Sequence, residues 1–282
     1  SPKALALKEN KGYFCSMKTK TLAIVGCGGL ASIVVQALDK GLLPDFQIIG
    51  TYSRTFDKAQ MFSNHINNAD RGYTCTPCDS LEALFELKPD YIVETSSPDS
   101  LKELALPALR NGISIVTISI GGLADAAFYE AVKKTASEHG TRVHIASGAV
   151  GGFDVLRTVS LMEESTVTFE STKSPRAMRH SPVYNPISET QEYTSFEGTA
   201  VEAIALFPRQ VNVSVAAALA STGPENVKVS IKTVPNFVGD NHCIEIKNQE
   251  IHAVLNIYSQ TAKIAGWSIV NTLRNITSPI AF

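Results

Sequence analysis

Apolar runs and helix-like segments alternate along the first half of the chain. Short runs that are apolar on both faces are followed by longer segments with the spacing of amphipathic helices. Strands with two apolar faces suit a parallel sheet that helices cover on each side. The pattern therefore predicts a doubly wound α/β domain. The expected strands are 22–25, 47–51, 91–94, 113–118 and 142–146, and the expected helices are 30–40, 56–66, 100–110 and 125–139.

The second half of the chain has a different pattern. The segment 227–234 alternates apolar and polar residues, as a strand with one solvated face does, and 242–247 partly repeats this alternation. A helical segment follows Gly198, stops at Pro208 and resumes over 211–220. We expect an α+β second domain with an open sheet.

Composition and charge narrow the function classes. Of the 282 residues, 44% are hydrophobic and 18% are charged, which is typical of a globular protein with a substantial core. The net charge of −2 gives no general affinity for nucleic acid, and no apolar run approaches the ~20 residues that span a bilayer. The five scattered cysteines favour a reducing, cytoplasmic location. Cys75 and Cys78 form a CxxC pair without a second pair, so we expect no metal site.

A glycine-rich turn follows the first expected strand. The letters "GCGGLA" give Gly26-x-Gly28-x-x-Ala31, and Gly29 and Leu30 open the next helix. In a dinucleotide site the first glycine makes the turn, the second admits the pyrophosphate, and the third small residue allows close packing. The free N–H groups of the helix then bind phosphate. The motif predicts a Rossmann-type cofactor site, and its alternative is a strand–helix turn that binds no phosphate.

The end of the second expected strand bears on which nicotinamide cofactor is used. NAD sites usually place an acidic residue there, but this chain has Ser53 and Arg54. An arginine can bind a 2′-phosphate, which favours NADP, alongside NAD. Alternatively, Arg54 lies over the adenine or in solvent. At the end of a third strand, residues 94–97 are expected to line the crevice; they include Thr95, Ser96 and Ser97.

The segment 144–159, "HIASGAVGGFDVLRTV", resembles the segment that joins the two domains of L-aspartate dehydrogenases, enzymes related to NAD biosynthesis. The resemblance covers nearly all of 21–274. The resemblance implies that Ala149 and Asn212 contact the nicotinamide and that His242 is the catalytic histidine. Further matches follow in order: "VETSSPDSL" (93–101), "TKSPRAM" (172–178), "FEGTAVEAIALFPRQVNVSVAAALA" (196–220) and "GDNHCIEI" (239–246).

Besides the non-acidic end of its second expected strand, the chain departs from this family at two positions. Gln210 stands where the family often has Asn, and Val234 stands where it often has the Asp of an Asp-Pro pair. Both departures bear on the identity of the substrate.

His242 also has suitable chemistry. A histidine titrates near neutrality, which suits proton transfer during oxidation of an amine. Its strand alternation places it with Ile244 and Ile246 on the covered face, where the alternative is a histidine of the core. Asn241, its neighbour in the same motif, is expected to bind substrate, and His180 is an alternative site histidine.

A dicarboxylate substrate also needs cationic groups. Lys173 continues the apolar face of the expected strand 167–173, so we expect it to bind a substrate carboxylate; its alternative is a solvated lysine. Arg176, Arg179 and Arg209 are further candidates that the sequence does not rank.

The sequence therefore predicts oxidation of L-aspartate, or a close analogue, at its alpha carbon by NAD(P), giving iminoaspartate and then oxaloacetate and ammonia. Two alternatives stay open, a homoserine-dehydrogenase-like enzyme with another small substrate and a non-catalytic NAD(P)-binding sensor. The resemblance also implies a homodimer. The expected parts are a cofactor domain (17–147), a substrate-binding and dimerisation domain (148–255), a C-terminal helix that packs back on the first domain (256–282) and an N-terminal extension or cloning remnant (1–16).

Overall fold

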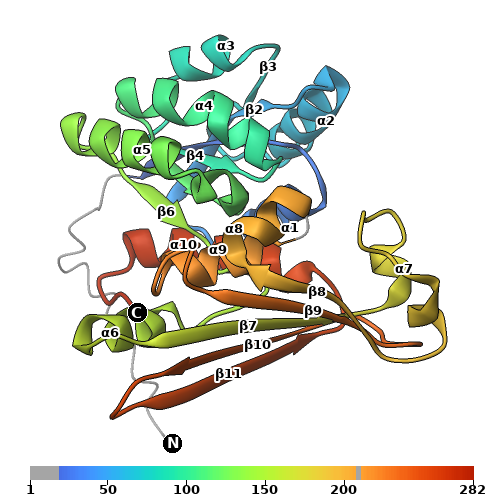
Figure 1. Cartoon of the computed structure of the whole chain (residues 1–282). Coiled ribbons are helices and arrows are strands. Elements are labelled where there is room, and N and C mark those ends of the chain that lie inside the picture. Colours follow the sequence, from blue (N-terminus) through green and yellow to red (C-terminus); the bar gives the residue numbers. More distant parts are fainter. Residues whose placement is uncertain (1–18, 208–210) are drawn as a thin grey trace, which may run out of the picture.

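The computed structural model describes residues 19–207 and 211–282, and it contains two sheets (Figure 1). The first is a six-stranded parallel sheet in the order β3-β2-β1-β4-β5-β6, the arrangement of a dinucleotide-binding domain. This confirms the predicted fold class. Its strands are β1 (Lys20–Val25), β2 (Phe46–Tyr52), β3 (Thr76–Cys78), β4 (Tyr91–Glu94), β5 (Ser114–Thr117) and β6 (Val143–Ile145). Its helices are α1 (Gly29–Asp39), α2 (Phe56–Asn67), α3 (Leu81–Glu86), α4 (Pro98–Arg110), the 3₁₀ helix η1 (Ile120–Ala124) and α5 (Ala126–Glu138).

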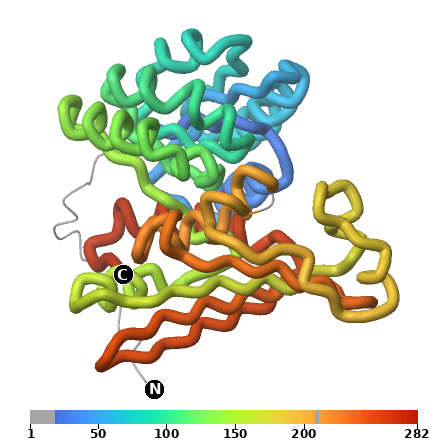
Figure 2. The backbone as a smooth tube through the Cα atoms, in the orientation of Figure 1, coloured from blue at the N-terminus to red at the C-terminus, as the bar shows by residue number. Residues whose placement is uncertain are grey.

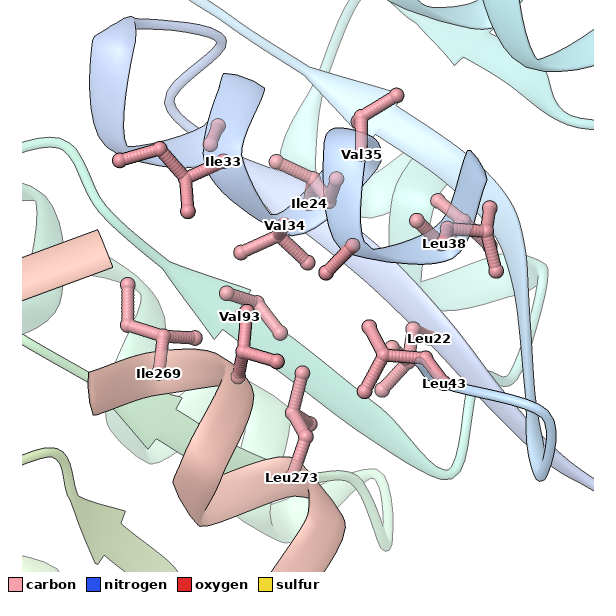
Figure 3. Close-up of a cluster of buried hydrophobic side chains, with 14 of the residues drawn as sticks. Leu22, Ile24, Ile33, Val34, Val35, Leu38, Leu43, Val93, Ile269 and Leu273 are labelled. Carbon is pink, nitrogen blue, oxygen red and sulfur yellow. The ribbon is translucent and has the colours of Figure 1, made fainter. Parts of the chain in front are cut away.

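Helices cover both faces of this sheet. In β1, Leu22 and Ile24 join one buried cluster, and Ala23 and Val25 join the other. The first cluster is completed by α1, α2 and the last helix, and the second by α3, α4 and α5 (Figures 1 and 3). The strands are therefore apolar on both faces because helices cover both faces of the sheet, as the sequence pattern predicted. The short elements β3 and α3 were not predicted as separate elements, because neither is long enough to show a periodicity.

The second sheet has five strands in the order β11-β10-β7-β9-β8. Of its neighbouring strand pairs, β7 and β9 are parallel and the others are antiparallel. Buried and more exposed residues alternate along β7, β9 and β10, as expected for a sheet with one covered face. The strands are β7 (Thr166–Lys173), β8 (Tyr193–Thr199), β9 (Lys228–Thr233), β10 (Asp240–Lys247) and β11 (His252–Ser259). The helices are α6 (Phe153–Met162), α7 (Pro175–Met178), the 3₁₀ helix η2 (Pro186–Glu189), α8 (Ala200–Leu206), α9 (Asn212–Leu219) and α10 (Lys263–Thr277).

The last helix returns to the first sheet. α10 packs against α1, where Gly266 meets Ile33 closely, and Ile269 and Leu273 enter the first buried cluster (Figure 3). Within the expected C-terminal part 256–282, β11 continues to Ser259 and the helix begins at Lys263. As a result, α10 is part of the core beside α1. Figure 2 shows the same path, with the red helix beside the blue segment that contains α1.

Besides the expectations for Arg209 and Gln210, two expected features fall on residues outside the described ranges. These are the extension 1–16 and the helix break at Pro208; on either side of that break, α8 ends at Leu206 and α9 begins at Asn212. None of the helices in the described ranges is long and apolar enough to cross a bilayer.

Candidate active site

The glycine turn after β1 has the geometry of a phosphate site. Gly26 has a φ of 93°, and a Cβ there would lie 2.8 Å from the backbone nitrogen of Ser96. A Cβ on Gly28 would meet no atom of the chain within 4 Å, so the backbone is open to a ligand at this point. No side chain caps the N-terminus of α1, which leaves its N–H groups free for an anion. A nicotinamide dinucleotide therefore fits this turn.

Ala31 and Thr95 stabilise the turn. Ala31 is completely buried in the first core cluster, so its methyl group fills the space where a glycine motif leaves room for packing. Thr95 donates its hydroxyl to the carbonyl of Gly26 at 2.7 Å, and its backbone N–H bonds Val25 O at 2.9 Å. These bonds join the ends of β1 and β4, where the crevice of an open α/β sheet is expected.

A crevice extends from this turn to the second sheet. Its main cavity has a volume of about 310 Å³, and a smaller cavity of about 60 Å³ lies beside Gly26. Ser96 and Ser97 line both cavities, which makes them parts of one crevice. The predicted site residues on the main cavity are Leu30, Thr95, Ser96, Ser97, Ala149, Lys173, Asn212 and His242, and those on the smaller cavity are Gly26, Ser53, Arg54, Ser96 and Ser97.

The smaller cavity contains charges of both signs. Arg54 lines it from the end of β2 and is exposed. Asp99 and Glu103 line it from α4, and the sequence analysis did not include either carboxylate. A 2′-phosphate here would meet one cation and two anions.

Glu94 lies beneath the crevice and does not line it, contrary to expectation. It is completely buried, and its carboxylate accepts hydrogen bonds from the backbone N–H groups of Ser96 at 2.7 Å and Ser97 at 3.1 Å. It also accepts from the hydroxyl of Thr117 at 2.8 Å. Burial raises the pKa of Glu94, and these hydrogen bonds oppose the rise. Glu94 thus fixes the turn after β4, and Ser97 in turn caps α4.

Asn212 connects the two halves of the site. Its side-chain oxygen accepts a hydrogen bond from the N–H of Gly121 in η1 at 2.8 Å. A Cβ on Gly121 would lie 2.7 Å from that oxygen, so a glycine is needed for this approach. The bond occupies the oxygen of Asn212 and leaves its NH₂ group as a donor on the main cavity. Gly148, the residue before Ala149, donates its N–H to the hydroxyl of Ser268 in α10 at 3.0 Å.

Three titratable side chains from the second sheet line the main cavity. Lys173, at the end of β7, is 9% exposed and forms an ion pair of 2.8 Å with Asp240 of β10. His242, also on β10, is 2% exposed, and its ring lies 5.5 Å from that of Phe169. The pKa of His242 is lowered to about 4, chiefly by burial and also by the Lys173 ammonium, while the Asp240 carboxylate opposes the shift. The histidine is therefore neutral at physiological pH.

Asp240 was missed in the sequence analysis, although the sequence contains a signal for it. It stands two residues before His242 on the same strand, and alternate residues of a strand share a face. Asn241 lies between them and so faces the other side of the sheet, where its amide donates to Asn256 at 2.8 Å. The structure does not bring Asn241 to the cavity.

The alternative cationic and histidine candidates lie elsewhere. Arg179 pairs with Glu189 at 3.0 Å, and His180 and Arg176 are exposed and do not line the main cavity. Arg209 and Gln210 lie outside the described residues.

The two cysteines of the CxxC pair are buried, Cys75 directly before β3 and Cys78 at its end. Cys75 contacts the hydroxyl of Ser63 at 3.4 Å, and burial raises the pKa of Cys75 to about 11. It is therefore a thiol rather than a reactive thiolate at neutral pH. In the described ranges, no group of three His, Cys, Asp or Glu side chains has an arrangement that could hold a metal ion.

Comparisons with known proteins agree on both parts of the chain. Residues 26–146 match the family model described as the NAD binding domain of homoserine dehydrogenase, and residues 154–276 match the model described as the C-terminal part of aspartate dehydrogenase. L-aspartate dehydrogenase of Methanococcus maripaludis is 30% identical over 271 residues, which cover 92% of this chain and 97% of that protein. L-aspartate dehydrogenase of Acinetobacter baylyi is 28% identical, with 93% and 99% covered.

Solved structures show the same relationship. Aspartate dehydrogenase from Thermotoga maritima matches with a TM-score of 0.74 and 27% identity, covering 93% of this chain and 99% of that one. Amine dehydrogenase from Mycobacterium smegmatis has a TM-score of 0.56 at 15% identity, and this likeness shows the fold alone.

Proposed function

The chain belongs to the L-aspartate dehydrogenase family, and we propose that it oxidises L-aspartate at its alpha carbon, giving iminoaspartate and then oxaloacetate and ammonia. It is an NAD(P)-dependent amino-acid dehydrogenase. The observation that carries the proposal is the main cavity itself. His242 and Lys173 line the same cavity as Ala149 and Asn212, and that cavity joins the crevice of the glycine turn.

The cofactor would lie along the crevice. Gly26, Gly28, Gly29 and the start of α1 would hold its pyrophosphate, and Ala149 and Asn212 would contact the nicotinamide amide. When bound, the nicotinamide supplies a hydride acceptor. We infer that NADP is preferred to NAD, because Arg54 lines the smaller cavity and no carboxylate ends β2.

Lys173 would bind a carboxylate of the substrate. Among the described residues, Lys173 is the one lysine or arginine that lines the main cavity. Its position at the end of β7 fixes where a carboxylate can approach. Its present partner, Asp240, carries the opposite charge. A substrate that has both a carboxylate and an ammonium group can pair with both side chains at once. L-Aspartate has these groups together with a second carboxylate.

His242 would act as the general acid–base. It is neutral in the free protein, because burial and the Lys173 charge disfavour its protonated form. Substrate carboxylates in the cavity would offset the Lys173 charge and raise the pKa of the imidazole toward neutrality, where proton transfer is most efficient. His242 can then take a proton from the substrate amine or from the water that attacks the imine.

A homodimer in the cytoplasm is also part of this proposal. The outer face of β10 and β11 displays Val254 and Tyr258, which are 55% and 56% exposed, and a second copy could cover them. The described cysteines are all free thiols, which fits a reducing compartment. Measuring the mass of the protein in solution by light scattering would test the dimer.

A substrate panel tests the activity. Amino acids, homoserine, and oxaloacetate with ammonia are each assayed with NAD and with NADP, and the nicotinamide absorbance is followed. We expect reduction of the cofactor with L-aspartate and oxidation with oxaloacetate plus ammonia. Turnover of homoserine without L-aspartate would identify a different dehydrogenase, and cofactor binding without any turnover would indicate a sensor.

A further inference from the structure

Ser171 and His242 face each other across two neighbouring strands. They are directly opposed in the antiparallel register of β7 and β10, on the covered face of the second sheet. Ser171 is 3% exposed and His242 is 2% exposed. The Cβ atoms of directly opposed residues in such a pair lie ~4.5–5.5 Å apart. Rotation of the serine side chain about its first torsion therefore brings its hydroxyl within reach of the imidazole.

Both side chains carry a buried polar atom without a partner. Among the residues that the structure describes, Ser171 Oγ and His242 Nδ1 are buried and make no hydrogen bond. Buried polar groups in proteins are nearly always hydrogen-bonded, because an unpaired one loses its water without replacement. A single bond between the two atoms would satisfy both.

The other side chains that neighbour this pair on the covered face are apolar or already paired. Asp240, two residues before His242 on β10, is in the ion pair with Lys173. Across β9, Ser171 is opposed by Ile231, and across β11, His242 is opposed by Ile257. On its own strand, Ser171 lies between Phe169 and the Lys173 that pairs with Asp240. In the strand register, Ser171 is thus the unpaired polar residue next to His242 Nδ1.

We propose that Ser171 is a positioning residue for His242, whose hydroxyl accepts a hydrogen bond from Nδ1–H and leaves the lone pair of Nε2 facing the main cavity. This proposal rests on the proposed function of His242 as general acid–base. A neutral imidazole carries one N–H, and the bond made by one nitrogen decides which nitrogen is protonated. Without Ser171, an Nδ1–H would be buried and unpaired, so the proton would move to Nε2. Nε2 could then no longer accept a proton.

The same bond is kept throughout proton transfer. When Nε2 takes a proton from the substrate amine or from water, Nδ1–H continues to donate to Ser171, and it still does so after Nε2 returns the proton. A hydroxyl carries no charge, so it orients the ring without stabilising the imidazolium as a carboxylate would. The charged groups facing His242 on the main cavity are Lys173 of β7 and Asp240 of its own strand, which act on its pKa in opposite directions.

The decisive test observes the imidazole without turnover. His242 is followed by ¹⁵N NMR of its ring nitrogens in the full-length protein labelled at histidine, as wild type, Ser171→Ala and Ser171→Thr. His242→Ala identifies its signals. We expect the wild type and Ser171→Thr to carry the proton on Nδ1 and Ser171→Ala to carry it mainly on Nε2. The same tautomer in the wild type and Ser171→Ala would overturn the proposal.

A kinetic measurement on the same proteins complements the spectra. We expect Ser171→Ala to lower kcat about tenfold or more with little change in KM for L-aspartate, and Ser171→Thr to restore most of it. Ser230 lies on β9 with its side chain toward the other face of the sheet, so Ser230→Ala serves as the matched control with unchanged kcat. Cofactor affinity and the unfolding temperature show whether each variant is folded.

The outcomes separate this proposal from the proposed function. If the wild type does not oxidise L-aspartate but Ser171→Ala shifts the tautomer, the proposed function fails and the pairing of Ser171 with His242 stands. If L-aspartate is oxidised and Ser171→Ala changes neither the tautomer nor kcat, the role of Ser171 fails alone.

Discussion

The two sheets contribute to the active-site cavity through different parts of their strands. The parallel sheet presents the turns that follow β1, β4 and β5, and these offer mainly backbone N–H groups and small side chains. The second sheet presents the covered face of β7 and β10, from which Lys173, Asp240 and His242 project. In the proposed function, cofactor binding thus depends on the conformation of turns, and chemistry depends on side chains held by a strand register. Substitutions in the two regions should therefore change different kinetic constants.

Removal of the imidazole is expected to have the largest effect. His242→Ala should lower kcat by about 10²-fold or more, the usual contribution of a general acid–base, because His242 is the only histidine that lines the main cavity in the described ranges. Stopped-flow and steady-state assays with L-aspartate measure it. The affinity for NADP should stay as in the wild type, since most of the proposed cofactor contacts lie in the turns of the parallel sheet. Unchanged kcat in His242→Ala would exclude the proposed role of this residue.

The buried imidazole should also make stability depend on pH. The pKa of His242 is about 4 in the folded protein against 6.5 for an unperturbed histidine, so the unfolded chain binds a proton more readily between these values. The free energy of unfolding should fall as pH decreases from 6.5 to 4, by up to about 3 kcal/mol at about 1.36 kcal/mol per pKa unit. Denaturant unfolding at a series of pH values measures this.

His242→Gln provides the control for the pH effect. The glutamine does not titrate, so the part of the pH dependence that belongs to this site should disappear in the variant. Equal slopes for the two proteins between pH 4 and 6.5 would show that His242 is not buried in its neutral form.

Substitutions at two glycines distinguish the conformation of the turn from the space that it leaves for the cofactor. Gly26→Ala should lower the unfolding temperature and weaken NADP binding, because its positive φ and its contact with Ser96 leave no room for a Cβ. Gly28→Ala should weaken NADP binding about tenfold with an unchanged unfolding temperature, because its Cβ meets no atom of the chain. Thermal unfolding and cofactor titration measure both. In each variant kcat at saturating cofactor should stay near the wild-type value, and equal effects of Gly28→Ala on kcat and affinity would contradict the division of roles.

Much of the fold and of the candidate site could be predicted from the sequence, because both depend on hydrophobic patterns along the chain. Apolar runs gave the parallel strands, and the period of two placed Lys173 and His242 on the covered face. The same period places Asn241 on the face opposite to His242, where the structure has it, so the motif that contains both residues did not predict the position of Asn241 correctly. The pairing of Lys173 with Asp240 depends on the register of β7 against β10, and a single sequence does not state that register. The inward position of Glu94 depends likewise on the turns that close over it.

The preference between NADP and NAD should be the smallest of these effects. Arg54 is exposed, and exposed ion pairs contribute at most about 1 kcal/mol, which corresponds to roughly a fivefold change in affinity. Arg54→Ala should therefore raise KM for NADP by up to about fivefold and leave KM for NAD unchanged, with a smaller difference at high salt because exposed charges are screened.

Glu103→Gln removes a carboxylate from the same small cavity and should shift the preference the other way, toward NADP. Kinetics with both cofactors at two ionic strengths measure this. Equal losses for NADP and NAD in Arg54→Ala would mean that the arginine contacts the adenine or ribose common to both, and turnover that favours NAD in the wild type would end the argument for a 2′-phosphate site.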